Sequence, residues 1–206
     1  MEAIMRTDEH HIAKHNKILG IKDDDIQLVF LGDSLTRRWE DYIDIWTKYF
    51  ATYHPANLGV GGDYLENIKW RVLHGELEGL HPKVILLLAG TNNLDKDTEA
   101  MIVNGIKEIV EIIQGKLVNA KVVVLGLFPR NSAEAGINYG QKIIDINQQL
   151  AAEYVDTEVI FKDIGAMLTN EQGNVNTEIM PDGLHLNGKG YELIGPKLKE
   201  IIEEVW

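Results

Sequence analysis

The chain has 206 residues, of which 32 are acidic and 20 basic, so its formal net charge is -12, and it contains no cysteine. The acidity argues against nucleic acid or an anionic membrane surface as a partner, because both attract basic patches. The lack of cysteine excludes a disulfide framework, a thiolate zinc site and a cysteine nucleophile. The length fits a single domain spanning residues 1–206, large enough to bury a hydrophobic core.

Nothing in the apolar pattern indicates membrane insertion. The longest purely apolar run, Val84–Ala89, is far shorter than the roughly 20 residues that a membrane-spanning helix needs. The segment Met1–His15 is polar and lacks the apolar stretch of a secretory signal peptide. A cytoplasmic protein without stable membrane insertion is therefore expected, while a signal peptide removed ahead of this sequence stays an alternative.

Strand-like and helix-like patterns alternate along the chain. Residues 8–19 carry a helical pattern that Gly20 closes, and residues 1–25 are expected to form an accessory segment packed outside the main fold. Apolar runs predict the strands, and runs that are apolar throughout are typical of strands buried on both faces. The five predicted strands are Ile26–Leu31, Ala56–Leu58, Val84–Ala89, Val122–Leu127 and Glu158–Phe161.

Apolar residues recur at helical spacing between and after these strands. Asp63 followed by Glu66 predicts a capping box that opens the second helical stretch. The predicted helical stretches are Trp39–Phe50, Leu65–Val72, Ile102–Ile113, Ile143–Tyr154 and Tyr191–Ile202.

Strands separated by helices pair in parallel through right-handed crossovers. The predicted fold is therefore α/β, a three-layer α/β/α sandwich around a five-stranded parallel sheet with the flavodoxin-like order 2-1-3-4-5. Such sheets bind ligands at the carboxyl ends of their strands, near the switch point, which here falls between the first and third strands.

Polar residues cluster at the ends of the predicted strands, where that rule places a site. GDSLT (32–36) follows the first strand, NLGVGGD (57–63) the second, GTNN (90–93) the third and PDGLHLN (181–187) the fifth. In these four blocks, taken in order, the chain resembles the SGNH (GDSL) hydrolase family from about Ile26 to Tyr191. The family's serine, glycine, asparagine, acid and histidine fall on Ser34, Gly62, Asn92, Asp182 and His185.

Within that family the chain is most similar to the catalytic subunits of intracellular platelet-activating-factor acetylhydrolases, and bacterial carbohydrate acetylesterases share much of the pattern. The resemblance implies a serine esterase, and neither a metal nor another cofactor is expected. The physical chemistry of the blocks agrees with it. A serine hydroxyl is a poor nucleophile until a base removes its proton, and His185 with Asp182 three residues earlier fits the serine–histidine–acid arrangement.

Each of these residues also has a structural alternative. Ser34 stands where an N-cap is common, and Asp182-Gly183 alone would be a turn. Asp33 is a rival acid beside Ser34, but we expect it to bond local backbone amides instead.

The tetrahedral intermediate of ester hydrolysis needs hydrogen-bond donors for its oxyanion. Three are predicted: the Ser34 N–H, the Gly62 N–H and the side-chain amide of Asn92. A glycine lets the backbone approach a substrate closely, and Gly61-Gly62 also fits a tight turn. Asn93 fits a turn residue and is assigned no role.

Other motifs carry less. His11 and His15 have the i,i+4 spacing of a metal pair, but no third ligand is visible and a solvated helix face is expected. Trp39, Tyr42 and Trp46 are predicted as core and interface aromatics, with a substrate-facing role for Trp39 as the alternative.

The resemblance implies an ester substrate with a small acyl group. In the acetylhydrolase subgroup the side chains that narrow the acyl pocket match Leu35, Thr91 and Leu184, so acetyl is expected to fit better than a long chain. The alcohol part stays open between a sugar, a glycerolipid and others. Asn131–Asn138, where the chain departs from the subgroup, is expected to line that side.

The sequence thus predicts a serine esterase for short-chain, chiefly acetyl, esters. Two alternatives stay open: an acetylhydrolase or lysophospholipase acting on glycerophospholipid-type esters, and a catalytically silent module that binds an acylated glycan. A homodimer is a further expectation from the resemblance, with the exposed faces of Trp39–Phe50 as its contact patch.

Overall fold

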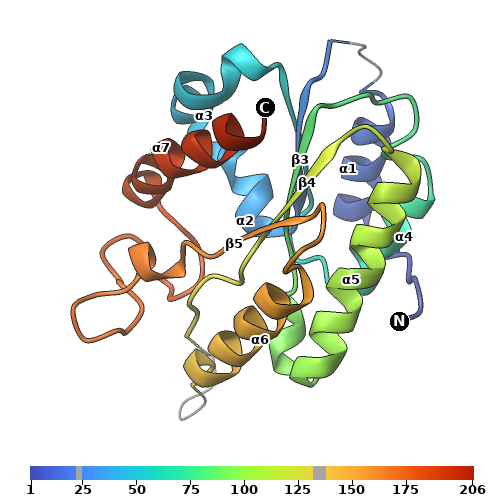
Figure 1. Ribbon diagram of the computed structural model, residues 1–206. Helices are drawn as coiled ribbons and strands as arrows, with labels where there is room; N and C mark the ends of the chain where they lie inside the picture. The colour runs from blue at the N-terminus through green and yellow to red at the C-terminus, as the bar shows by residue number, and fades with distance from the viewer. Residues whose placement is uncertain (22–24, 132–137) are drawn as a thin grey trace.

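The computed structural model describes residues 1–21, 25–131 and 138–206. Its centre is a sheet of five parallel strands in the predicted order β2-β1-β3-β4-β5 (Figure 1). The strands are β1 (Leu28–Gly32), β2 (Pro55–Gly59), β3 (Val84–Leu88), β4 (Lys121–Leu125) and β5 (Ile160–Lys162).

Helices cover both faces of the sheet, so the predicted three-layer α/β/α sandwich is confirmed. One face carries α1 (Glu9–Leu19), α4 (Leu65–Leu73), α5 (Glu99–Lys116) and α6 (Gly140–Glu153), and the other α2 (Ser34–Arg37), α3 (Ile43–Phe50) and α7 (Gly188–Val205). Short 3-10 helices cover Arg38–Tyr42, Ala51–Tyr53, Thr91–Asp95 and Gly165–Leu168.

The strands are buried on both faces because each supplies side chains alternately to the two helical layers. In β1, Val29 and Leu31 pack toward the layer of α4 and α5, whereas Leu28 and Phe30 pack toward α3 and α7. The helix-layer contacts on both sides hold the carboxyl ends of the central strands in register, with Gly32 beside Gly59 and Leu88.

The aromatic residues of the Trp39–Phe50 stretch belong mainly to the core, as predicted. Trp39 and Trp46 are buried and pack against Phe30, and the ring of Trp39 also contacts Tyr191 on α7. Ile43 is 57% exposed on the outer side of the same stretch. A homodimer formed through this stretch stays a prediction.

The capping box predicted at Asp63 and Glu66 is wrong. Helix α4 begins at Leu65, and the side chain of Asn67 accepts the N–H of Tyr64 at 2.9 Å. Asp63 is fully buried and its Oδ2 accepts from Nε of Arg71 at 2.7 Å. A buried carboxylate needs a charged partner, so the tertiary ion pair overrides the local capping pattern.

Helix α1 follows its prediction in extent, since Asp8 accepts the N–H of His11 at 3.0 Å and Gly20 ends the helix. The prediction of a solvated His11–His15 face is wrong, because both rings are buried. His15 Nδ1 lies 2.7 Å from Oε1 of the buried Glu76, and desolvation lowers the pKa of His11. This face of α1 is buried because His11 and His15 lie against the buried carboxylates of Asp63 and Glu76 and not against water.

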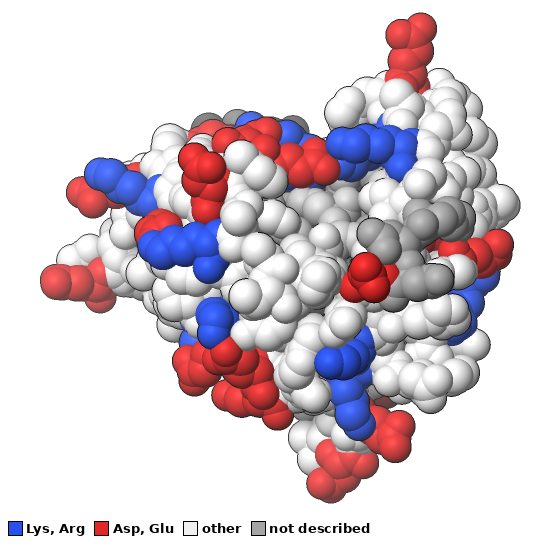
Figure 2. Space-filling model, turned by 90° about the horizontal axis from the view of Figure 1, so that it is seen from above, with Lys and Arg blue, Asp and Glu red and all other residues white. Residues whose placement is uncertain are grey.

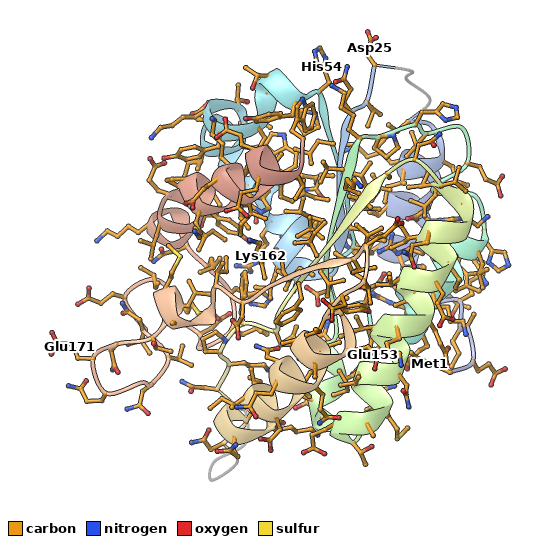
Figure 3. The ribbon with its side chains drawn as sticks, in the orientation of Figure 1. Met1, Asp25, His54, Glu153, Lys162 and Glu171 are labelled. Carbon is orange, nitrogen blue, oxygen red and sulfur yellow. The ribbon has the colours of Figure 1, made fainter. Side chains whose placement is uncertain are left out.

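The two edges of the sheet differ in what surrounds them. Asp25 and His54 lie at the edge where the strands begin, whereas Met1 lies toward the edge where they end (Figure 3). Over the first of these edges, Lys and Arg side chains lie among Asp and Glu side chains (Figure 2). In the described ranges, no helix is both long and apolar enough to cross a membrane.

Candidate active site

Ser34 stands at the junction between β1 and α2, at the carboxyl edge of the sheet. The turn is closed by Asp33, which precedes the helix and accepts the N–H of Leu35 at 2.9 Å. Asp33 thus takes the N-cap position, and Ser34 is the first residue of the helix. This confirms the expected turn role of Asp33 and leaves the Ser34 hydroxyl available for other contacts.

The hydroxyl of Ser34 is joined to two residues that lie about 150 positions further along the chain. Ser34 Oγ lies 2.9 Å from Nε2 of His185, and the opposite ring nitrogen of His185, Nδ1, lies 2.7 Å from Oδ2 of Asp182. The three side chains form one continuous hydrogen-bonded line. In this arrangement the carboxylate holds the histidine ring so that Nε2 can accept a proton from the serine.

The loop that carries the acid and the histidine is folded around the carboxylate. Asp182 Oδ1 accepts the backbone N–H groups of Leu184 at 2.9 Å and His185 at 2.7 Å. Partial burial raises the pKa of Asp182, but the hydrogen bonds from His185 and Leu184 outweigh it and lower the pKa to about 2. The carboxylate is therefore charged at neutral pH. Gly183 permits the turn, since its φ of 72° is a left-handed conformation.

Asp33 differs from Asp182 in both surroundings and contacts. It is fully buried, and this desolvation raises its pKa to about 7. Its Oδ1 is engaged by Leu35, while Asp182 is the carboxylate that contacts His185. The two acids that the sequence left as rivals are thereby separated by geometry.

The predicted oxyanion donors come from three neighbouring loops. Gly61 approaches Ser34 closely, because a Cβ on that glycine would lie 4.0 Å from the Cβ of Ser34. Within the described ranges, the N–H groups of Ser34 and Gly62 donate to no other protein group. The side-chain amide of Asn92 donates to the carbonyl of Asp63 at 2.8 Å, which ties the third loop to the second.

Asn92 and its neighbour Asn93 have different surroundings. Asn92 is half-buried at the candidate site. Asn93 is fully buried, accepts the N–H of Leu65 at 2.9 Å and donates to Glu66 at 3.1 Å. Asn93 therefore anchors the start of α4, a role that its sequence position did not reveal.

The three residues predicted to contact the substrate differ in how deeply they are buried. Leu35 is buried in the core, and its carbonyl accepts the hydroxyl of Tyr191 at 2.7 Å. Thr91 is also buried, whereas Leu184 is half-buried beside His185. A cavity of about 10 Å³ beside Leu35 lies inside the hydrophobic core, where Phe30 and Phe128 also line it.

Asn131 approaches the acid-histidine loop, since its N–H donates to the carbonyl of Gly183 at 2.8 Å. The predicted role of Asn131–Asn138 beside the alcohol falls largely on residues 132–137, which lie outside the described residues.

The sequence analysis missed the charged residues that brace the site. Arg71 is fully buried and donates to the carbonyls of Leu58 and Gly32, at 3.2 and 3.1 Å, so it links the ends of β1 and β2. Arg6 donates to Gly61 O. An arginine within the apolar stripe of Ile68 and Val72 could have indicated that Arg71 is buried. No local sequence pattern indicated a role for Arg6.

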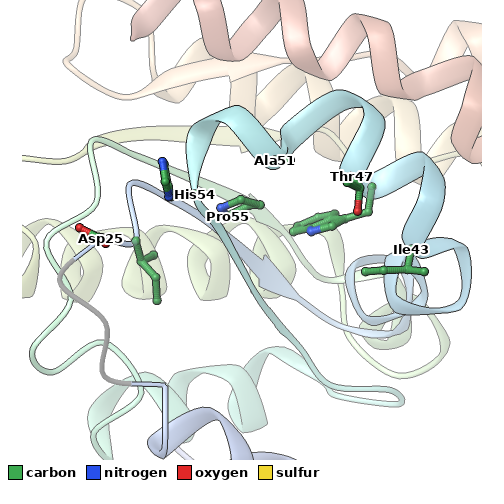
Figure 4. Close-up of a pocket in the computed structure, with 8 residues that line it drawn as sticks. Asp25, Ile43, Thr47, Ala51, His54 and Pro55 are labelled. Atoms are coloured by element: carbon green, nitrogen blue, oxygen red, sulfur yellow. The ribbon is translucent and has the colours of Figure 1, made fainter.

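A pocket lies at the edge of the sheet where the strands begin, opposite the edge that carries Ser34. Its volume is about 380 Å³, and it is lined by residues that include Asp25, Ile43, Thr47 and His54 (Figure 4). It adjoins the starts of β1 and β2, whereas Ser34 follows the end of β1, so it is separate from the serine site. Among the residues described, no group of three or more His, Asp or Glu side chains is arranged to hold a metal ion.

Comparison with known proteins identifies the family and agrees with the fold. Residues 30–193 match the model of the GDSL-like lipase/acylhydrolase family. The chain is 34% identical over 200 residues to platelet-activating factor acetylhydrolase IB subunit alpha2 of Homo sapiens, covering 96% of this chain and 86% of that protein. It is 33% identical over 178 residues to the alpha1 subunit of Homo sapiens, covering 86% and 75%.

A solved structure adds support for the fold. A GDSL-like lipase from Bacteroides thetaiotaomicron superposes with a TM-score of 0.78 at 20% identity, covering 94% of this chain and 98% of that one. The family match and the sequence relatives together define the class: the chain belongs to the GDSL-like lipase/acylhydrolase family. It is a carboxylic ester hydrolase.

Proposed function

We propose that this chain is a serine esterase that hydrolyses short-chain carboxylic esters, acetyl esters in particular, through an acyl-enzyme. The observation that carries the proposal is the hydrogen-bonded line from Ser34 through His185 to Asp182, with 2.9 and 2.7 Å between successive groups. A charged carboxylate, an oriented imidazole and a hydroxyl in contact are the elements that activate a serine.

In the first half of the reaction, Ser34 Oγ attacks the ester carbonyl carbon while its proton moves to Nε2 of His185. The carbonyl oxygen becomes an oxyanion that accepts the N–H groups of Ser34 and Gly62 and the amide of Asn92. When the tetrahedral intermediate collapses, the carbon–oxygen bond to the alcohol breaks. His185 then gives its proton to the leaving alkoxide, and the acyl group stays on Ser34.

In the second half, water attacks the acyl carbon and gives a proton to His185, and the same donors hold the new oxyanion. Collapse breaks the bond to Ser34 Oγ, which recovers its proton from His185, and the carboxylic acid leaves. Asp182 remains charged throughout, in agreement with its lowered pKa, and stabilises the imidazolium form of His185.

The acetyl preference is supported by the residues next to the predicted catalytic groups and by the relatives. Leu35 directly follows Ser34 and Thr91 directly precedes Asn92, and both side chains are buried. The relatives named as platelet-activating factor acetylhydrolase subunits support an acetyl ester as substrate and make a glycerophospholipid-type alcohol the second candidate.

Turnover of p-nitrophenyl acetate tests the proposal. Ser34→Ala is expected to abolish it while circular dichroism and the unfolding midpoint stay those of the wild type. Acetyl esters should be hydrolysed faster than octanoyl esters. Retained turnover in pure, folded Ser34→Ala would reject the nucleophile, and a chain-length series that peaks at octanoyl would reject the small acyl site. A silent glycan-binding module predicts no turnover in the wild type and no labelling by a fluorophosphonate.

A further inference from the structure

The segment before α1 reaches the loop that supplies the predicted oxyanion donor. Nη1 of Arg6 donates to the carbonyl oxygen of Gly61 at 2.7 Å and to Oδ1 of Asp63 at 2.8 Å. Figure 1 shows the N-terminus near the edge of the sheet where the strands end. Arg6 lies outside residues 30–193, the part of the chain that matches the family.

The carbonyl of Gly61 and the N–H of Gly62 belong to the same peptide group. A peptide group is planar and trans, so fixing the direction of its C=O fixes the N–H in the opposite direction. The bond from Arg6 to Gly61 O therefore sets where the N–H of Gly62 points. Because the guanidinium is cationic, it also polarises the peptide and makes that N–H a stronger donor.

This peptide needs such support because glycine stands on both sides of it. Glycine adopts left-handed and right-handed conformations with similar ease, and the φ of Gly62 is 78°. A Gly-Gly peptide is therefore among the easiest to flip. A flip would turn the N–H of Gly62 away from the oxyanion and replace it with a carbonyl oxygen, which repels negative charge.

The guanidinium is itself held in place. Nε and Nη2 of Arg6 donate to the two carboxylate oxygens of Asp8 at 2.9 and 3.2 Å. Asp8 also caps α1 through the N–H of His11. On the other side, Asp63 keeps Arg71 as a second partner, so the loop does not depend on Arg6 for its charge balance.

We infer that Arg6 is a positioning residue of the active site, which orients the Gly61–Gly62 peptide as an oxyanion donor. This inference rests on the proposed function of Gly62. Residues 6–8 are then part of the catalytic apparatus rather than an external addition to it.

The test compares Arg6→Ala with the wild type on p-nitrophenyl acetate. We expect kcat to fall about tenfold and KM to change by less than about twofold, since misplacing a donor affects the transition state more than the bound substrate. Guanidinium ions at millimolar concentration should restore part of the lost kcat. Arg6→Lys should keep part of the activity, because an ammonium is a point charge without the fork that joins Gly61, Asp63 and Asp8.

Arg37→Ala is the matched control. Its side chain is 25% exposed, as is that of Arg6, but it pairs with Asp41 and not with the oxyanion loop. A purely structural role for Arg6 predicts lower stability in Arg6→Ala, unchanged kcat per folded molecule and no rescue by guanidinium. That result would overturn the inference.

Hydrogen exchange separates this inference from the proposed function. Amide exchange in a peptide covering Gly61–Asp63 should be faster in Arg6→Ala than in the wild type or in Arg37→Ala. If the wild type hydrolyses no ester, the proposed function fails, and exchange still decides whether Arg6 holds the loop. Unchanged exchange would reject the positioning role whatever the activity.

Discussion

Arg71 and Asp63 form an ion pair in the interior of the protein, with 2.7 Å between Nε and Oδ2 and neither side chain exposed. The same arginine pairs with the buried carboxylate of Glu76. Its two bonds to the carbonyls at the ends of β1 and β2 place this pair directly beneath the loops that carry Ser34 and Gly62. The site is therefore built on a buried charged layer.

Replacing Arg71 by methionine should destabilise the protein strongly. The change leaves two buried carboxylates without their main partner, which typically costs about 3–5 kcal/mol. Urea unfolding of Arg71→Met against the wild type measures the loss. Arg37→Met, which breaks a partly exposed pair with Asp41, should cost less than about 1 kcal/mol. Equal losses in the two variants would contradict the structural role of Arg71.

The two adjacent asparagines should separate catalysis from stability. Asn92→Ala removes a predicted oxyanion donor and should lower kcat about 10²–10³-fold. Its loss of stability should be only about 1 kcal/mol, from the bond to the Asp63 carbonyl. Asn93→Ala removes the buried acceptor at the start of α4 and should lower stability by about 1–3 kcal/mol. Esterase kinetics and urea unfolding of both variants provide the comparison, and a larger kcat loss in Asn93→Ala would reverse the assignment.

Asp182→Asn should lower kcat by at least about 10²-fold while the fold survives. The amide oxygen of the variant can still accept the N–H groups of Leu184 and His185, so the turn is kept. The variant has no charge to stabilise an imidazolium on His185. Near-normal kcat would show that another group orients the histidine.

The buried carboxyl of Asp33 should make stability depend on pH. Its pKa is raised by burial from 3.8 to about 7, so the folded state binds more protons than the unfolded state between these values. This group therefore contributes stability at low pH that is lost as the pH rises from about 4 to about 7. Asp33→Asn keeps the acceptor for Leu35 and lacks this titration.

The difference in unfolding free energy between the wild type and Asp33→Asn gives the measurement. Unfolding by urea at several pH values should show the wild type losing stability relative to the variant as the pH rises through this window. Parallel curves, or a wild type that gains on the variant, would contradict a raised pKa for Asp33.

The sheet was predictable because its signals are local and consistent. Runs such as Val84–Ala89 are apolar without interruption, and each is followed by glycine or polar residues at the carboxyl end. The alternation of these runs with helical stretches predicted a parallel sheet in its simplest order, and the polar blocks after the strands predicted where Ser34, Asn92 and His185 lie.

The buried charges were not predictable in the same way, because their partners lie far apart in the chain. Asp63 with Glu66 has the spacing of a helix cap, yet Asp63 turns inward to Arg71. His11 and His15 lie on a helix with a polar sequence. Their burial depends on the carboxylates of Asp63 and Glu76, which come from the loops after β2 and after α4. A periodicity argument cannot report a contact that only the tertiary fold creates.

Trapping of the acyl-enzyme tests the central claim most directly. The wild type is mixed with p-nitrophenyl acetate, quenched in acid within the first turnover, digested and examined by mass spectrometry. Ser34 should carry one acetyl group, His185→Ala should show little or none, and Ser34→Ala should show none at that peptide. Acetylation of another residue at the rate of turnover, or turnover without any acetyl on Ser34, would contradict the serine mechanism.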